Sequence, residues 1–143
     1  MPSHRYAQLH DIPSLITLFH QLGYPTNPDN LAQCIRTPDS ATHILVSELN
    51  DKICAVLVLH FITPVHETKL WALISALVVD ESIRGTGIGQ QLLIAAEQIA
   101  SDRNCSQIAL SSSEQRTRAH HFYENNGYKE IRKRFVKILS VPE

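Results

Sequence analysis

The fold is decided by the stretch LVVDESIRGTGIGQQLL, residues 77–93. Its apolar beginning is typical of a buried strand, its middle carries three glycines at alternate positions, and its end has the apolar spacing of a helix. A short apolar segment, residues 107–110, follows that helix. The order strand, helix, strand predicts two parallel strands joined by a right-handed crossover.

The glycine turn is suited to hold an anion. The first N–H groups of a helix have no carbonyl partners, and glycine lets a ligand approach them closely. The helix dipole favours a negative group there by about 0.3 to 1 kcal/mol, and Arg84 adds a positive charge beside the turn. The turn therefore predicts a phosphate site, although a turn kept only for tight packing is the alternative.

The spacing around the turn excludes two phosphate-binding classes. A nucleotide triphosphatase needs Gly-Lys-Ser/Thr, whereas Gly89 is followed by Gln90 and Gln91. A dinucleotide-binding fold needs GxGxxG, whereas the spacing here is GxGxG. Both classes are therefore disfavoured.

Two helices are expected before the sheet. The first spans residues 12–22, with Asp11 as its N-cap and Gly23 ending it. The second begins near Pro28 and ends before Pro38. Its inward positions are expected to be Leu31, Cys34 and Ile35.

Strand patterns fill most of the remaining chain. Residues 43–49 and 53–61 predict an antiparallel hairpin, and residues 69–79 predict the strand that enters the glycine turn. A short helix through Ala119 is expected to stop at Gly127, and residues 128–139 have the pattern of a final strand pair. Without repeats or linkers, residues 1–143 are predicted to form a single mixed α/β domain.

Composition narrows the function further. The 143 residues are 43% hydrophobic and 19% charged, with a net charge of −1, which is the balance of a soluble domain and argues against nucleic-acid or membrane partners. Nothing resembles a targeting or membrane-spanning segment. The cysteines form no CxxC pair, so we expect neither zinc nor disulfides and a cytoplasmic location. These cysteines are Cys34, Cys54 and Cys105.

Two segments resemble a known family. Arg84, Gly87 and Gly89 fill the signature Gln/Arg-x-x-Gly-x-Gly/Ala, which is motif A of the GNAT superfamily of acyl-CoA N-acyltransferases. Residues 119–128, AHHFYENNGY, are similar to the AxxFYxxxGF/Y segment of that family, and Arg5-Tyr6-Ala7 with Asp11 adds a weaker likeness. The resemblance implies a central mixed, mostly antiparallel sheet with flanking helices and a parallel strand pair on either side of the motif A helix.

The resemblance also implies where acetyl-CoA binds. Pantetheine would pair like an extra strand with the backbone of Leu77, Val78 and Val79. The pyrophosphate would lie on Arg84, Gly85, Thr86, Gly87, Ile88, Gly89 and Gln90. Arg116 or Arg118 would reach a CoA phosphate, with a solvent-facing role as the alternative.

For the chemistry, the resemblance places Tyr123 near the CoA sulfur as a general acid, the alternative being a purely packing aromatic. Many family members carry a carboxylate at the positions held here by Ser75 and Ala76. The general base is therefore open. The candidates are Glu67, His66, His60 or a water chain.

The combined reading is an acetyl-CoA-dependent N-acetyltransferase that acts on a primary amine of a small molecule by direct attack, without metal. Adjacent helical residues point about 100° apart, so His120 and His121 do not suggest a metal site. The tail resembles small-amine members such as aminoalkylphosphonate acetyltransferases. Arg132, Lys133 and Arg134 would attract an anionic acceptor or form a solvated turn. Alternatives are a peptide acceptor or a non-catalytic acyl-CoA-binding regulatory domain, and a homodimer is an option.

Overall fold

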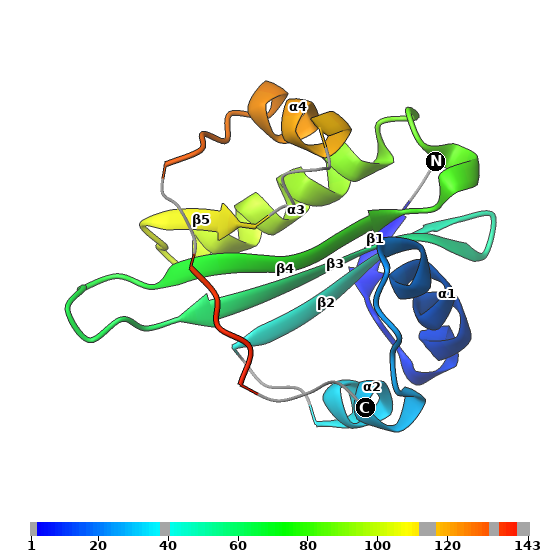
Figure 1. Ribbon diagram of the computed structural model, residues 1–143. Coiled ribbons are helices and arrows are strands. Elements are labelled where there is room, and N and C mark those ends of the chain that lie inside the picture. The colour runs from blue at the N-terminus through cyan, green and yellow to red at the C-terminus, as the bar shows by residue number, and fades with distance from the viewer. Residues whose placement is uncertain (1–2, 38–40, 112–116, 132–134, 140–143) are drawn as a thin grey trace. The chain divides into compact units, whose positions relative to one another are not determined.

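The computed structural model describes residues 3–37, 41–111, 117–131 and 135–139. It divides into two compact units, residues 1–111 and 112–143, which are described in turn (Figure 1). The expectation of a single domain stays a prediction.

A five-stranded sheet forms the centre of the first unit. Its strands follow one another in sequence order, and all neighbours are antiparallel except the parallel pair β4 and β5. The predicted mixed, mostly antiparallel sheet with one parallel pair is confirmed. The strands are β1 (Ser3–Tyr6), β2 (Thr42–Leu49), β3 (Lys52–Ile62), β4 (Trp71–Val79) and β5 (Gln107–Leu110).

The predicted hairpin is β2 and β3. Leu49 pairs with Lys52, which leaves Asn50 and Asp51 as a two-residue loop. Both loop residues have positive φ, 54° and 62°. Asn and Asp tolerate this left-handed conformation better than most residues, and it matches the twist of the flanking strands.

Helices cover both faces of the sheet within the first unit (Figure 1). Helices α1 (Ile12–Leu22) and α2 (Pro28–Arg36) lie on one face, and α3 (Ile88–Asp102) lies on the other. Strand residues alternate between the faces, so one set packs on α1 and the other on α3. The α1 face is held by Leu15, Leu18 and Phe19 of α1 against Val46, Val56 and Val78 of the sheet.

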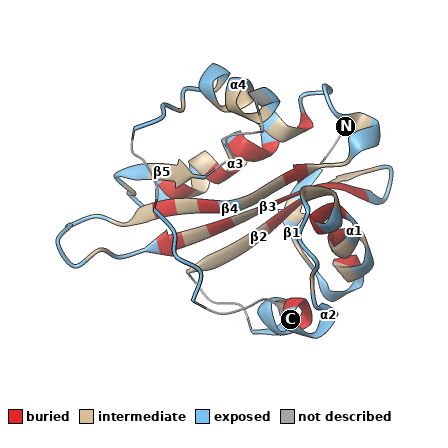
Figure 2. Ribbon diagram, in the orientation of Figure 1, coloured by how far each residue is buried: buried red, intermediate tan, exposed pale blue. Residues whose placement is uncertain are grey.

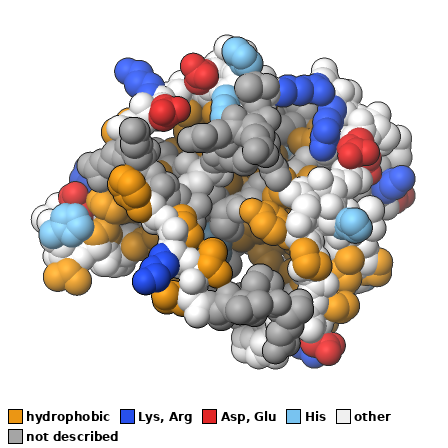
Figure 3. Space-filling view, in the orientation of Figure 1, with side chains coloured by type: hydrophobic (Ala, Val, Ile, Leu, Met, Phe, Trp, Pro, Cys, Tyr) orange, Lys and Arg blue, Asp and Glu red, His pale blue; other side chains and the backbone are white. Residues whose placement is uncertain are grey.

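Burial follows this layering (Figure 2). The centre of β3 is fully buried, as are Leu92 and Leu93 of α3. On the face shown in Figure 3, acidic and basic side chains are interspersed, in keeping with a net charge of −1. No described helix combines the length and the apolar character needed to cross a bilayer.

One predicted detail of the helices is confirmed in position only, and one is wrong. Asp11 is the N-cap residue of α1, as predicted, but its side chain makes no capping hydrogen bond to that helix. Its buried carboxylate instead accepts two hydrogen bonds from Arg5, at 2.7 and 2.9 Å, and one from the Gln8 N–H at 2.8 Å. Cys34 is exposed, because α2 turns Leu31 and Ala32 toward the core.

The second unit contains α4 (Thr117–Asn125), which ends near Gly127 at a φ of 92°. The predicted helix and its stop are confirmed. The predicted strand pair over residues 128–139 is wrong for the part described, since residues 128–131 and 135–139 form no strand. An alternating pattern alone does not make a strand, because strand formation depends on cross-strand packing.

Candidate functional site

The strand β4 parts from β5 halfway along its length. β5 pairs only with residues 71–74 of β4, whereas β3 pairs with β4 as far as Val79. Among the described strands, residues 76–79 are therefore paired on one side only. An extended ligand could add to this edge of the described sheet.

A bulge in β4 marks the point of parting. Val58 pairs with Ala76 and the next residue, Leu59, pairs with Ile74. Ser75 is therefore the extra residue of β4, and its side chain is exposed. Bulges re-aim side chains and occur often beside active sites.

The glycine turn has the backbone that an anion site needs. Gly85 and Gly87 have φ values of 85° and 86°, which residues with a Cβ rarely adopt. Gly87 is the N-cap of α3 and offers no side chain to its N–H groups. The space beside both glycines is open to a ligand, because a Cβ there would meet nothing within 4 Å.

Local hydrogen bonds hold the turn in this shape. The Asp80 carboxylate accepts from the N–H and the hydroxyl of Ser82, both at 3.0 Å. These bonds lower the pKa of Asp80. The Thr86 hydroxyl donates to the Ile83 carbonyl at 2.7 Å. The turn is thus fixed before any ligand binds.

Arg84 joins the turn to the strand. Its Nε donates to the Val79 carbonyl at 3.3 Å, and the side chain is otherwise exposed. Sequence reasoning placed the charge of Arg84 but missed this bond. The bond puts the guanidinium where the one-sided segment of β4 enters the turn.

Tyr123 lies on α4 in the second unit and is partly buried. Its ring contacts Phe122 and Tyr128 edge to face, with centroids 5.4 and 6.0 Å away. Its carbonyl accepts from the N–H groups of Asn126 and Tyr128, each at 3.0 Å. These contacts fix the end of α4. The role of Tyr123 beside the CoA sulfur stays a prediction. Four basic residues with a predicted role lie outside the described residues, namely Arg116, Arg132, Lys133 and Arg134.

The structure separates the candidate bases. His66 and Glu67 lie on the exposed loop before β4, where the His66 ring contacts Trp71. His60 instead lies on β3, and its Nε2 is 2.7 Å from Ser75 Oγ. Burial lowers the pKa of His60. The bulge makes this pairing, and nothing in the local sequence of either residue signals it.

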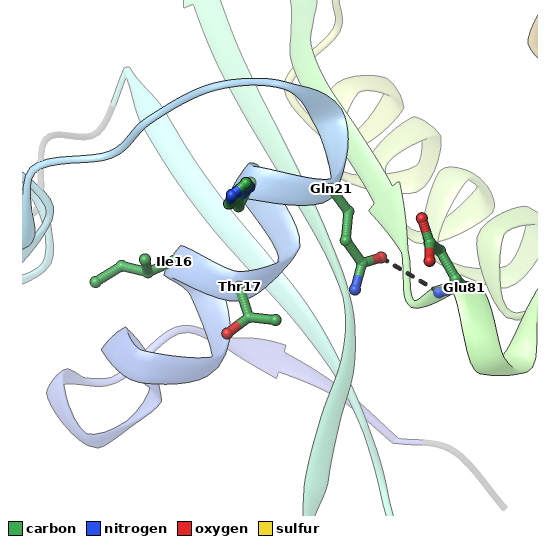
Figure 4. Close-up of a pocket in the computed structure, with 5 residues that line it drawn as sticks. Ile16, Thr17, Gln21 and Glu81 are labelled. Carbon is green, nitrogen blue, oxygen red and sulfur yellow. Dashed lines mark hydrogen bonds between the residues drawn. The ribbon is translucent and has the colours of Figure 1, made fainter.

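An open groove of about 550 Å³ lies between α1 and the segment that follows β4 (Figure 4). Gln21 Oε1 accepts from the N–H of Glu81 at 3.2 Å and closes one side. No sequence motif pointed to this groove. Its lining residues are Ile16, Thr17, His20, Gln21 and Glu81.

Within the described ranges, no three His, Cys, Asp or Glu side chains gather as metal ligands.

Comparison with known proteins decides the family. Residues 8–128 match the family model of the GNAT acetyltransferases. The chain belongs to this family. As a GNAT chain it is an acyl-CoA-dependent N-acyltransferase, and the motif A resemblance seen in the sequence is confirmed.

Relatives of the GNAT chain cover nearly its whole length. It is 31% identical over 140 residues to an aminoalkylphosphonate N-acetyltransferase of Salmonella typhimurium, with 94% of this chain and 90% of that protein covered. A GNAT family acetyltransferase from Staphylococcus aureus has a TM-score of 0.79 at 24% identity, covering 96% of this chain and 98% of its own. A transcriptional regulator from Bacillus halodurans has a TM-score of 0.87 at 22% identity, covering 97% and 100%. The two structures show the fold.

Proposed function

We propose that this GNAT chain transfers the acetyl group of acetyl-CoA to a primary amine of a small molecule, by direct attack of the amine on the thioester. One observation carries the proposal. The one-sided segment of β4, residues 76–79, runs directly into the open glycine turn before α3. A strand edge followed by an anion site fits a ligand that has an extended amide chain at one end and phosphates at the other.

The residues available fit acetyl-CoA along its length. Pantetheine would add to the edge of β4 at Leu77, Val78 and Val79, using main-chain hydrogen bonds. The pyrophosphate would be held by N–H groups of residues 85–90, with Arg84 adding a positive charge. Acetyl-CoA would supply the activated acetyl group. On β4 these contacts would use the backbone, so the side chains of the strand are free to pack in the core.

The acceptor is proposed from the relative that is 31% identical, whose substrate is an aminoalkylphosphonate. Such a molecule carries an amine to be acetylated and an anionic group for recognition. We propose an acceptor of this kind, a small primary amine with an anionic end. A cytoplasmic location and a homodimer stay predictions.

Direct attack requires no acyl-enzyme on the chain. Burial raises the pKa of the Cys54 and Cys105 thiols above their ordinary value of 9.0. A thiol protonated in this way is a poor nucleophile. Tyr123 would donate its phenolic hydrogen to the departing sulfur.

An acceptor panel tests the function. Purified protein with acetyl-CoA is offered aminoalkylphosphonates, neutral alkylamines, aminoglycosides and lysine peptides, and acetylated products are detected by mass. We expect the aminoalkylphosphonates to give the highest kcat/KM. Preference for peptides would favour a protein acceptor, and acetyl-CoA binding without any product would favour a regulatory domain.

A matched pair of glycine variants tests the anion site. Gly87→Ala is expected to raise the Kd for acetyl-CoA about tenfold, because a left-handed φ is costly for alanine and the turn must shift. Calorimetric titration measures the Kd. Gly23→Ala is the control, since Gly23 also has a left-handed φ, 98°, with open space beside it but ends α1. Equal affinities of the two variants would contradict the site.

A further inference from the structure

A row of polar side chains crosses three neighbouring strands of the first unit. His60 on β3 lies between Thr42 on β2 and Ser75 on β4. Its Nε2 is 2.7 Å from Ser75 Oγ, and its Nδ1 is 3.4 Å from Thr42 Oγ1. Thr42 and His60 are direct partners in the register of the sheet.

The row lies on the α1 face of the sheet. His60 is two residues beyond Val58, and Val58 packs against the core beneath α1. Since alternate residues of a strand share a face, His60 lies on that face too. His60 is partly buried, whereas Ser75 is exposed. The row thus ends at the exposed side chain of Ser75.

Ser75 lies where the reacting end of the substrate is expected. It is the bulged residue and the first residue of β4 beyond the pairing with β5. With the phosphates at the glycine turn, the pantetheine arm would run back along β4 from Val79 toward Ser75. Ser75 is two residues from Leu77, a distance of about 7 Å along a strand. This step rests on the proposed function.

We propose that Ser75 and His60 form the proton relay that neutralises the acceptor amine. Ser75 Oγ accepts a proton from the ammonium group while its own hydroxyl proton moves to His60 Nε2. The electron pair of the broken N–H bond stays on the nitrogen as its lone pair. The relay requires the tautomer of His60 that carries its proton on Nδ1, which lies 3.4 Å from Thr42 Oγ1, so that Nε2 is the acceptor.

The remaining steps conserve atoms and electrons. The nitrogen lone pair forms the bond to the acetyl carbon, and the pair of the broken carbon–sulfur bond stays on sulfur. The nitrogen then loses its second proton, which balances the proton taken up by sulfur. His60 returns the first proton to water before the next cycle.

The relay would supply the proton acceptor that the residues at positions 75 and 76 do not provide as a carboxylate. At neutral pH only about 0.04% of an alkylamine is unprotonated. Ser75 and Ala76 stand where many family members have a carboxylate, as noted above. Burial lowers the pKa of His60 from its ordinary value of 6.5. This shift favours the neutral imidazole, the form that can accept a proton.

Two acceptors separate this role from a structural one. An alkylammonium must lose a proton before attack, whereas an alkoxyamine is already neutral at neutral pH. With the alkylamine, Ser75→Ala and His60→Gln are each expected to lower kcat/KM about 10²-fold, and the double variant no further. With the alkoxyamine, all three are expected to stay close to the wild type. Thermal melting checks folding, and Ser75→Ala removes one exposed hydroxyl only.

Further variants provide the controls. His10→Gln and Ser101→Ala make the same chemical changes at exposed positions that have no part in the site, and should leave both activities unchanged. Ser75→Glu places a carboxylate at the bulge. Its activity with the alkylamine should therefore be close to that of the wild type, unlike that of Ser75→Ala. Adding His60→Gln to Ser75→Glu should have little further effect.

The possible outcomes are distinct. Equal losses with the two acceptors, or no loss with the alkylamine, would overturn the relay while leaving the proposed function intact. A wild-type protein that acetylates neither acceptor would overturn the proposed function and the relay together.

Discussion

Replacing Tyr123 by phenylalanine is expected to lower kcat for acetyl transfer about 10²- to 10⁴-fold, the usual contribution of a general acid. The ring contacts with Phe122 and Tyr128 would survive, because only the hydroxyl is removed. The Kd for acetyl-CoA should not change. The variant thus separates the chemical step from binding.

The size of this effect follows from two pKa values. A tyrosine near 10 and a thiol near 8.5 make complete transfer to the thiolate uphill by about 1.5 units, or roughly 2 kcal/mol. Tyr123 is therefore expected to stabilise the developing negative charge on sulfur by a hydrogen bond. Complete proton transfer in the transition state is not expected. The loss should fall toward the lower end of the range.

Pre-steady-state and steady-state kinetics at saturating acetyl-CoA measure the effect. Tyr24→Phe is the control, because it removes a phenolic hydroxyl from an exposed residue that lies outside the glycine turn and outside residues 119–128. Unchanged turnover of Tyr123→Phe would show that the general-acid role is wrong.

The second large effect is on stability. Asp11→Ala is expected to lower the free energy of unfolding by about 1 to 3 kcal/mol, because the Gln8 N–H and two donors of Arg5 would lose their carboxylate acceptor. The total free energy of unfolding of a protein of this size is roughly 5 to 15 kcal/mol. Arg5 would keep its bond to Glu48 on β2 at 2.7 Å, so the loss is confined to the link between β1 and the start of α1.

The same carboxylate predicts a dependence on pH. Burial raises the pKa of Asp11, but the hydrogen bonds from Arg5 and from the Gln8 N–H outweigh it and hold the pKa below 3.8. A lowered pKa in the folded state contributes stability above the unfolded value near 3.9, and this contribution disappears as the pH falls through the folded pKa. The difference in the free energy of unfolding between wild type and Asp11→Ala should therefore become smaller below about pH 4.

Urea denaturation at neutral and acidic pH measures both effects. Asp102→Ala is the control, because this exposed carboxylate at the end of α3 only accepts a bond from Gln98. Its effect should stay within about 0.5 kcal/mol. If the free energies of unfolding of wild type and Asp11→Ala differed equally at both pH values, the role of the Asp11 carboxylate would be contradicted.

The features that could be predicted from sequence are those set by neighbours in the chain. Gly23 ends α1 with a positive φ, and Gly85 and Gly87 shape the turn before α3, as their positions suggested. The hairpin turn at Asn50 and Asp51 is equally local. The parallel pair β4 and β5 followed from a general rule about strand, helix, strand units.

The errors involve contacts between distant residues. Asp11 stands at the N-cap of α1 as predicted, but its carboxylate bonds Arg5 of β1 and not an N–H of that helix. The periodicity of α2 placed Cys34 inward, whereas the helix turns Leu31 and Ala32 to the core. Strand pairing likewise depends on partners that residues 128–139 do not themselves encode.

The candidate site shows the same division. The glycine turn and the strand before it were recognised from one continuous stretch of residues. The hydrogen bond between His60 and Ser75 depends on the register of β3 and β4 and on a bulge within it. Register with a bulge has no short sequence signature, so His60 appeared only as one of several candidates.

The most direct test of the account is the mass of an aminoalkylphosphonate after incubation with the purified wild-type protein and acetyl-CoA. The account predicts a product one acetyl group heavier, formed in proportion to enzyme and to time, and absent when either acetyl-CoA or protein is omitted. An unchanged amine mass across aminoalkylphosphonates, alkylamines and aminoglycosides would contradict the central claim that this GNAT chain acetylates small primary amines.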